Sequence, residues 1–255
     1  LYTQRGSKPG RQKANNRPQK MSGRSVSQRR GQESRASLRA EESREPDQLS
    51  QAIILSGSSQ TRQSISRINF PKDRNQKVMV IKECIQLLSQ PGIEIDKSVA
   101  VALLFQIGKC RPQSVVLEKS VAKLITSFNK SLFTAKDIGN TCYGLRGLVG
   151  RNYSIQALVA TLANKIELSV ETLSAQEIGN ACYGLQKLDG TQCSTQALVA
   201  ALAKKVESSR EMLSAQHIGN ACYGLQNLDG THHTTHYLVA ALAEKVKSGS
   251  ERLNA

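Results

Sequence analysis

The sequence predicts an all-α protein: an α-solenoid of helical-hairpin repeats of about 40 residues, preceded by a disordered basic segment. Three observations lead to this prediction. The motif IGNACYGLQ occurs at residues 178–186 and again at 218–226, and a near copy, IGNTCYGLR, occupies 138–146. Apolar residues around each copy recur with the helical period of about 3.6 residues. The composition also changes sharply near residue 50.

Residues 1–50 are predicted to be disordered. The first 30 residues carry nine Lys or Arg and no Asp or Glu, and they are rich in Ser, Gln, Asn and Gly. A segment of this composition has too little apolar surface to form a core. Two interpretations fit it: an arm that contacts phosphates without sequence preference, or a solubilising linker or organellar targeting segment of similar composition.

Residues 51–92 are predicted to be a transition region with one lead-in helix, which Pro91 and Gly92 end. The apolar stripe of this helix consists of Val80, Ile81, Cys84, Leu87 and Leu88. Residues 93–132 are interpreted as a degenerate first repeat, because two helical patterns there match the next unit at an offset of 39 residues. A degenerate repeat is expected at the edge of a stack, because one of its faces has no neighbouring repeat to pack against.

Three clear repeats and the start of a truncated further one are predicted at residues 133–172, 173–212, 213–252 and 253–255. The last two full repeats agree at 28 of 40 positions, so their helices are expected to share one arrangement. Ser174 and Glu177 predict a capping box at the start of the first helix, and Thr195 is expected to cap the second. One such pair cannot bury its apolar face alone, so the pairs are expected to stack.

One stripe of each first helix is predicted to be buried. Ile178, Cys182 and Leu185 follow the spacing i, i+4, i+7, and the recurring cysteine is expected to act as a small core hydrophobe. Two glycines also recur in each first helix, starting with Gly139 and Gly144, and each costs roughly 1 kcal/mol relative to Ala. Close helix–helix contact is one explanation for the glycines, and close approach of a ligand backbone is the other.

The opposite face of each first helix carries the predicted binding residues, and it is expected to contribute little to stability. Tyr can stack on a base, an amide can bond a base edge, and Lys or Arg can meet a phosphate. The alternative is an Asn ladder between neighbouring loops, with each Tyr packed between repeats. The predicted RNA-binding residues are Lys136, Asn140, Tyr143, Arg146, Gln176, Asn180, Tyr183, Lys187, Gln216, Asn220, Tyr223 and Asn227.

Charge and missing motifs narrow the class of function. Lys and Arg number 35 against 20 Asp and Glu, and the net charge of +15 favours polyanionic partners. No apolar run approaches the roughly 18 residues that span a bilayer, so no membrane partner is predicted. No phosphate loop, nucleophile elbow or paired carboxylates recur, so we predict no enzyme, no catalytic residue, no metal and no cofactor. His232, His233 and His236 raise the question of a metal ion, but only one repeat has them.

The stretch LSAQEIGNACYGLQKLDG, residues 173–190, resembles the octotricopeptide repeat and related repeats that precede RAP domains. The resemblance covers residues 133–252 clearly and 93–132 faintly, and Cys-Tyr stands where that family often has Leu-Trp. It implies binding of single-stranded RNA in organellar RNA maturation, stability or translation, in a mitochondrion or chloroplast. Similar repeats also occur in bacteria, so a bacterial or cytoplasmic location is the alternative. The competing function is an armadillo-like or HEAT-like protein-interaction scaffold, or a bacterial effector, whose partners are other proteins.

Overall fold

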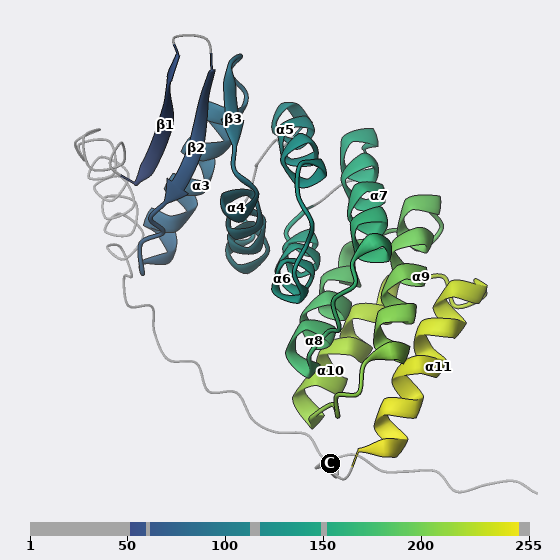
Figure 1. Ribbon diagram of the computed structural model, residues 1–255. Helices are drawn as coiled ribbons and strands as arrows, with labels where there is room; N and C mark the ends of the chain where they lie inside the picture. The colour runs from purple at the N-terminus through teal and green to yellow at the C-terminus, as the bar shows by residue number, and fades with distance from the viewer. Residues whose placement is uncertain (1–51, 60–61, 113–117, 149–151, 250–255) are drawn as a thin grey trace, which may run out of the picture. The chain divides into compact units, whose positions relative to one another are not determined.

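The computed structural model describes residues 52–59, 62–112, 118–148 and 152–249 (Figure 1). The chain divides into two units, Leu1–Pro46 and Asp47–Ala255, and all described residues belong to the second unit. The segment predicted to be disordered, residues 1–50, lies outside the described residues, and so does the predicted start of a further repeat at 253–255.

The described part is mostly helical, but it also contains a small sheet, so the expectation of an all-α fold is wrong. Strands β1 (Ile53–Ser59), β2 (Arg62–Ile68) and β3 (Ile93–Ile95) lie in the order β1-β2-β3. Strand β1 is antiparallel to β2, and β3 is parallel to β2. The apolar residues of β1 and β2 are mostly β-branched isoleucines, which favour a pleated surface, and Ile65 is fully buried in the core.

The predicted lead-in helix is α3 (Arg74–Leu88), which follows β2. The side chain of Asp73 caps it by accepting a hydrogen bond from the Gln76 backbone N–H at 2.9 Å. The predicted apolar stripe is buried, except that Leu87 is only partly covered. The helix ends before Pro91, and Gly92 adopts a left-handed φ of 77° that leads the chain into β3.

The remaining helices form two rows, in which each helix packs against the next member of its own row (Figure 1). The first row contains α4 (Lys97–Cys110), α6 (Ala135–Leu145), α8 (Ala175–Gly184) and α10 (Ala215–Gly224). The second row contains α5 (Glu118–Asn129), α7 (Tyr153–Leu168), α9 (Cys193–Ser208) and α11 (His233–Ser248). Short 3-10 turns, Leu185–Lys187 and Leu225–Asn227, extend α8 and α10. One hydrophobic core runs through both rows and reaches the sheet.

Three of the first-row helices begin with a capping box. Ser174 and Glu177 form the box predicted for α8, and Thr134 with Asp137 forms the same box in α6. In α10 the imidazole of His217 replaces the carboxylate and accepts a hydrogen bond from the Ser214 backbone N–H at 3.4 Å. A helix start that lacks the acid at this position therefore keeps its reciprocal cap.

The predicted cap of α9 by Thr195 is wrong. Helix α9 begins at Cys193 with Gln192 in the cap position, and Thr195 is buried within the first turn. The preceding turn sets this start, because the Asp189 carboxylate accepts hydrogen bonds from the backbone N–H and the hydroxyl of Thr191. The cap therefore lies three residues earlier than predicted, at Gln192 in place of Thr195.

The offset between the first two helical units is 38 residues, one fewer than the sequence pattern indicated. Asp96 occupies the cap position of α4 and Thr134 that of α6, which gives 134 − 96 = 38. The residues just before these caps, Ile95 and Phe133, are both buried. Ile95, the residue before the cap of α4, belongs to strand β3 because it pairs with Ile65 of β2.

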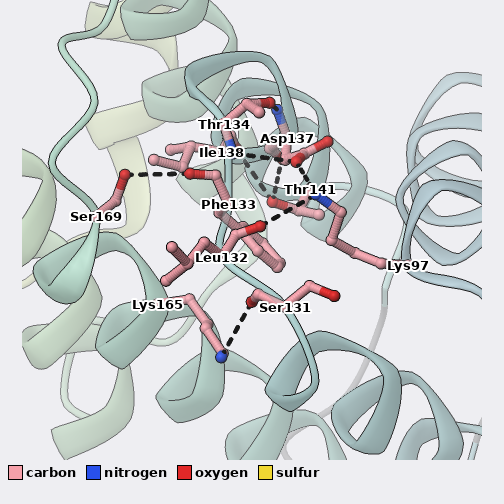
Figure 2. Close-up of polar contacts among 10 residues, drawn as sticks. All are labelled: Lys97, Ser131, Leu132, Phe133, Thr134, Asp137, Ile138, Thr141, Lys165 and Ser169. Atoms are coloured by element: carbon pink, nitrogen blue, oxygen red, sulfur yellow. Dashed lines mark hydrogen bonds and ion pairs between the residues drawn. The ribbon is translucent and has the colours of Figure 1, made fainter.

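Recurring polar contacts tie α7, α9 and α11 to the linker that precedes the first helix of the same pair, as Figure 2 shows for α7. Lys165 of α7 donates to the Ser131 carbonyl oxygen at 3.2 Å, and the Ser169 hydroxyl donates to the Phe133 carbonyl oxygen at 3.2 Å. Forty residues later, Lys205 donates to the Glu171 carbonyl oxygen and the Ser209 hydroxyl donates to the Leu173 carbonyl oxygen. Lys245, another 40 residues on, donates to the Ser209 carbonyl oxygen, the counterpart of the Asn129 carbonyl oxygen that Lys165 also contacts. Lys165, Lys205 and Lys245 thus hold the helices in place. Their charges belong to the basic excess of the chain, but their ammonium groups are already engaged and do not count toward binding of a polyanion.

Helix α4 is tied to α6 by Lys97 (Figure 2). Its ammonium lies 2.7 Å from the Asp137 carboxylate and donates to the Leu132 carbonyl oxygen at 3.0 Å. The Asp137 carboxylate also accepts from the Thr134 backbone N–H, so one acid both caps α6 and joins it to α4. The pair is largely shielded from water, which makes it worth more than an exposed surface pair.

Candidate nucleic-acid interface

The first-row helices bring four aromatic rings into one column. The ring centroids of Tyr143 and Tyr183 are 5.8 Å apart, and those of Tyr183 and Tyr223 are 5.4 Å apart. Phe105 of α4 extends the column, with its ring centroid 5.1 Å from that of Tyr143. Tyr143 and Tyr183 therefore have an aromatic neighbour on each side, so the tyrosines pack between repeats. Sequence reasoning missed Phe105 because the degenerate unit has Phe where the others have Tyr.

Arg146 is held against this aromatic column. Its guanidinium carbon lies 4.3 Å from the Tyr183 ring centroid and 4.9 Å from that of Tyr143. One guanidinium nitrogen, Nη1, donates to the Tyr143 hydroxyl at 2.6 Å. Arg146, predicted to meet phosphate, thus serves first to bridge two tyrosines of neighbouring repeats.

Gln186, the counterpart of Arg146 in the next repeat, is buried and anchors a contact that spans two units. Its side-chain amide donates to the Tyr183 carbonyl oxygen at 2.9 Å and accepts from Arg111 Nη2 at 2.9 Å. Arg111 ends α4 in the left-handed region, with a φ of 47°. The sequence carries no signal for this pair, because 75 residues separate its members and neither position repeats the other.

A row of asparagine amides accompanies the aromatic column. Asn140, Asn180 and Asn220 recur every 40 residues, and each precedes a tyrosine of the column by three positions on its helix. All three are partly exposed. Within the described residues, none of these amides makes a hydrogen bond, so the alternative of an Asn ladder between repeats is not present. Each amide keeps two donors and one acceptor oxygen free for solvent or a ligand.

The other predicted residues flank this row on both sides, near the two ends of the first-row helices. Lys136, Gln176 and Gln216 are exposed in the first turns of α6, α8 and α10. Lys187 and Asn227 are exposed at the opposite ends, and the Asn227 amide donates to the Gln186 carbonyl oxygen. A cavity of about 340 Å³ opens there, lined in part by Lys187, Asp189 and Asn227.

The histidines of the last repeat are engaged with their neighbours. His232 caps α11 and its Nδ1 lies 2.8 Å from the Thr234 hydroxyl, while the His233 ring centroid lies 4.4 Å from that of His232. His236 Nε2 lies 2.5 Å from the Gly230 carbonyl oxygen. Among the residues that the structure describes, no group of three or more His, Cys, Asp or Glu side chains is placed to hold a metal ion.

The recurring cysteines differ in burial. Cys142 and Cys182 are fully buried, as their place on the apolar stripe predicted, whereas Cys222 is exposed. Burial raises the pKa of the Cys182 thiol to about 12 and shifts the pKa of Cys142 in the same direction. The two buried thiols are therefore protonated and unreactive near neutral pH.

No helix in the described part of the chain is long and apolar enough to cross a membrane. A scan against protein-family models, a search of curated proteins and a search of solved structures each found no match to this chain.

Proposed function

We propose that the chain is an RNA-binding α-solenoid whose stacked helical pairs present a row of amides to one RNA strand. The observation that carries the proposal is the row of Asn140, Asn180 and Asn220. These amides recur at one helical position, are partly exposed and have no partner in the described part of the protein. An amide pairs well with the hydrogen-bonding edge of an unstacked base, which is how single-stranded RNA is read in sequence-selective complexes.

The solenoid interpretation is supported by the packing of the two rows. Successive first helices pack on one another, as do successive second helices. A lysine contact to the linker recurs in three repeats and a serine contact in two. A unit of this kind buries its apolar face only against its neighbours. The row of amides then runs along the stack from one first-row helix to the next.

Charge supports an anionic ligand. The chain carries a net charge of +15, and after the internal lysines are set aside, Lys136 and Lys187 stay exposed on either side of the amide row. A backbone that follows the stack would pass within reach of such cations, and the affinity would then depend strongly on salt.

The aromatic column changes the expected binding mode. The rings of Tyr143 and Tyr183 already contact aromatic neighbours on both sides, so a base does not insert between them without spreading the stack. In the proposal the packed tyrosines fix the spacing of the helices that carry the amides. The bases then contact the amides and the exposed edges of the tyrosine rings. RNA maturation, stability or translation in a mitochondrion or chloroplast belongs to the same proposal and depends on the resemblance of the repeat.

The test replaces all three asparagines with alanine and measures binding to a random-sequence pool of single-stranded RNA by fluorescence anisotropy. Each lost amide contact is worth about 1 kcal/mol, so the triple variant is expected to bind about 100-fold more weakly. The matched control is Asn164→Ala, an exposed amide on α7 in the other row. An unchanged affinity in the folded triple variant, or no RNA binding by the parent chain, would favour the protein-interaction scaffold.

A further inference from the structure

The outer face of α10 and α11 has the same residues as a face that is buried one repeat earlier. We define this outer face by Gly219, Cys222, Val239, Ala243 and Val246, each 40 residues after a buried residue. Val199 and Val206 of α9 are each 1% exposed, whereas Val239 and Val246 are 45% and 40% exposed. Identical side chains that are covered in one unit are thus open to solvent in the next.

The glycines on this face carry more specific information. A Cβ on Gly139 would lie 2.9 Å from Cγ of Glu177, and a Cβ on Gly179 would lie 3.2 Å from Cδ2 of His217. At both positions glycine makes room for the third helical residue of the following repeat. A Cβ on Gly219 would meet nothing within 4 Å, although Gly weakens a helix relative to Ala.

The turn after α10 repeats this relationship. A Cβ on Gly190 would lie 2.2 Å from the backbone nitrogen of Asp229 in the next repeat, whereas one on Gly230 would meet nothing within 4 Å. Gly219 and Gly230 therefore each leave an open space. At the two corresponding positions of the preceding repeat, the next repeat packs its first helix and its turn.

We propose that the outer face binds one more helical pair of the repeat's own pattern, joined to α11 in the way that each pair joins the one before it. The pair would place the third residue of its first helix over Gly219 and its turn over Gly230. It would also cover Cys222 and the open side of the Tyr223 ring, which is 50% exposed. The five residues that define the outer face are uncharged, and four of them have apolar side chains or none, which suits the apolar stripe of another helical pair. This inference does not depend on RNA binding.

The experiment adds a second copy of residues 213–252 directly after residue 252 of the full chain. All chains carry Cys193→Ser, and the added copy has serine in place of its cysteine, so that Cys222 is the exposed thiol under test. Labelling of Cys222 with a disulfide reagent at pH 8 is expected to become at least about tenfold slower in the extended chain, because reaction then requires local opening. Mass spectrometry of the labelled peptide identifies the site.

Gly219→Leu provides the matched control. In the parent chain the substitution is expected to leave Cys222 labelling unchanged, because a Cβ atom on residue 219 points into open space with nothing within 4 Å. In the extended chain it restores fast labelling, because leucine occupies the space that the new helix needs. Unchanged labelling in the extended chain, or an added copy that stays unfolded by circular dichroism, would overturn the proposal. It would also be overturned if the parent chain were a dimer by light scattering with Cys222 already protected, since the occupant would then be a second copy.

Discussion

Gly184 packs directly on the backbone of Cys142, so that a Cβ atom on Gly184 would lie 1.8 Å from the Cys142 carbonyl oxygen. Gly224 has the same relationship to Cys182, again at 1.8 Å. Two neighbouring first helices therefore touch backbone to backbone at this position. The second glycine of the motif is explained by close helix–helix contact, and a ligand backbone is not needed to account for it.

Gly184→Ala is expected to lower the free energy of unfolding by about 3 kcal/mol or more, because no rearrangement of side chains relieves a clash with a carbonyl oxygen. Gly219→Ala is the matched control and is expected to raise it by up to about 1 kcal/mol, since alanine favours the helix and nothing lies within 4 Å. Urea denaturation of the two variants measures both changes. Equal effects of the two substitutions would contradict the packing described for these helices.

A second pair of variants tests the buried stripe. Cys182→Asp is expected to destabilise the protein by several kcal/mol, because Cys182 is fully buried and an unpaired carboxylate would enter the core. Cys222→Asp places the same carboxylate at the same helical position, but on an exposed residue, and is expected to cost less than about 1 kcal/mol. Thermal unfolding followed by circular dichroism compares them. A Cys182→Asp variant that melts at the parental temperature would show that α8 is rotated from its described orientation.

The tyrosine face contributes more to stability than the sequence indicated. Tyr183 contacts Tyr143, Tyr223 and the guanidinium of Arg146, and aromatic and cation–π pairs are each worth about 1 kcal/mol. Tyr183→Ala is therefore expected to destabilise the fold by about 2–4 kcal/mol, and Tyr223→Ala by less, because Tyr223 has one ring neighbour in the described part of the chain. Denaturant titrations rank the two variants. A larger effect at Tyr223 would contradict the column.

The helical part of the fold follows from local pattern, and the rest depends on contacts between distant residues. The stripe of Ile178 and Cys182, together with the cap at Ser174, is visible in the sequence because each signal lies within a few residues. Strand β3 was missed because it pairs in parallel with β2 across the whole of α3, and a strand of three residues has little pattern of its own. Strands β1 and β2 are neighbours in the chain, but their many serines leave few apolar residues to mark them.

The candidate site shows the same limit. Helical geometry placed Asn180 and Tyr183 on one face correctly, since i and i+3 are neighbours on a helix. It could not show that the tyrosine rings contact one another, because that depends on the distance between successive helices, which the glycines set. The contact of Arg111 with Gln186 crosses an entire repeat and has no counterpart elsewhere in the pattern.

Thiol chemistry gives a prediction that depends on pH. Burial raises the pKa of Cys84 and of Cys182 to about 12, so the folded state holds these protons more tightly than the unfolded state, where a thiol titrates near about 8.5. The stabilisation is complete below the unfolded pKa, and it is lost as pH rises through the interval from about 8.5 to 12. Urea unfolding at pH 7.5 and pH 10 is expected to show lower stability at pH 10, with a smaller difference in Cys182→Ala. An equal difference in the variant would contradict the assignment to this thiol.

Removing residues 1–30 tests whether the basic segment contacts phosphates. The segment carries nine Lys or Arg and no acid, so each phosphate contact that it makes releases counterions when RNA binds. Its removal is expected to weaken binding to all single-stranded RNAs alike and to flatten the plot of log affinity against log salt by about 0.7 per lost contact.

The triple Asn→Ala variant is the complementary control, because amides release no counterions. It should lower the affinity and leave the slope unchanged. Anisotropy titrations between 50 and 300 mM salt, roughly the range in which such slopes are resolved, separate the two effects. A slope that is unchanged after the deletion would show that the segment is a linker and that the cations of the helical part carry the electrostatic term.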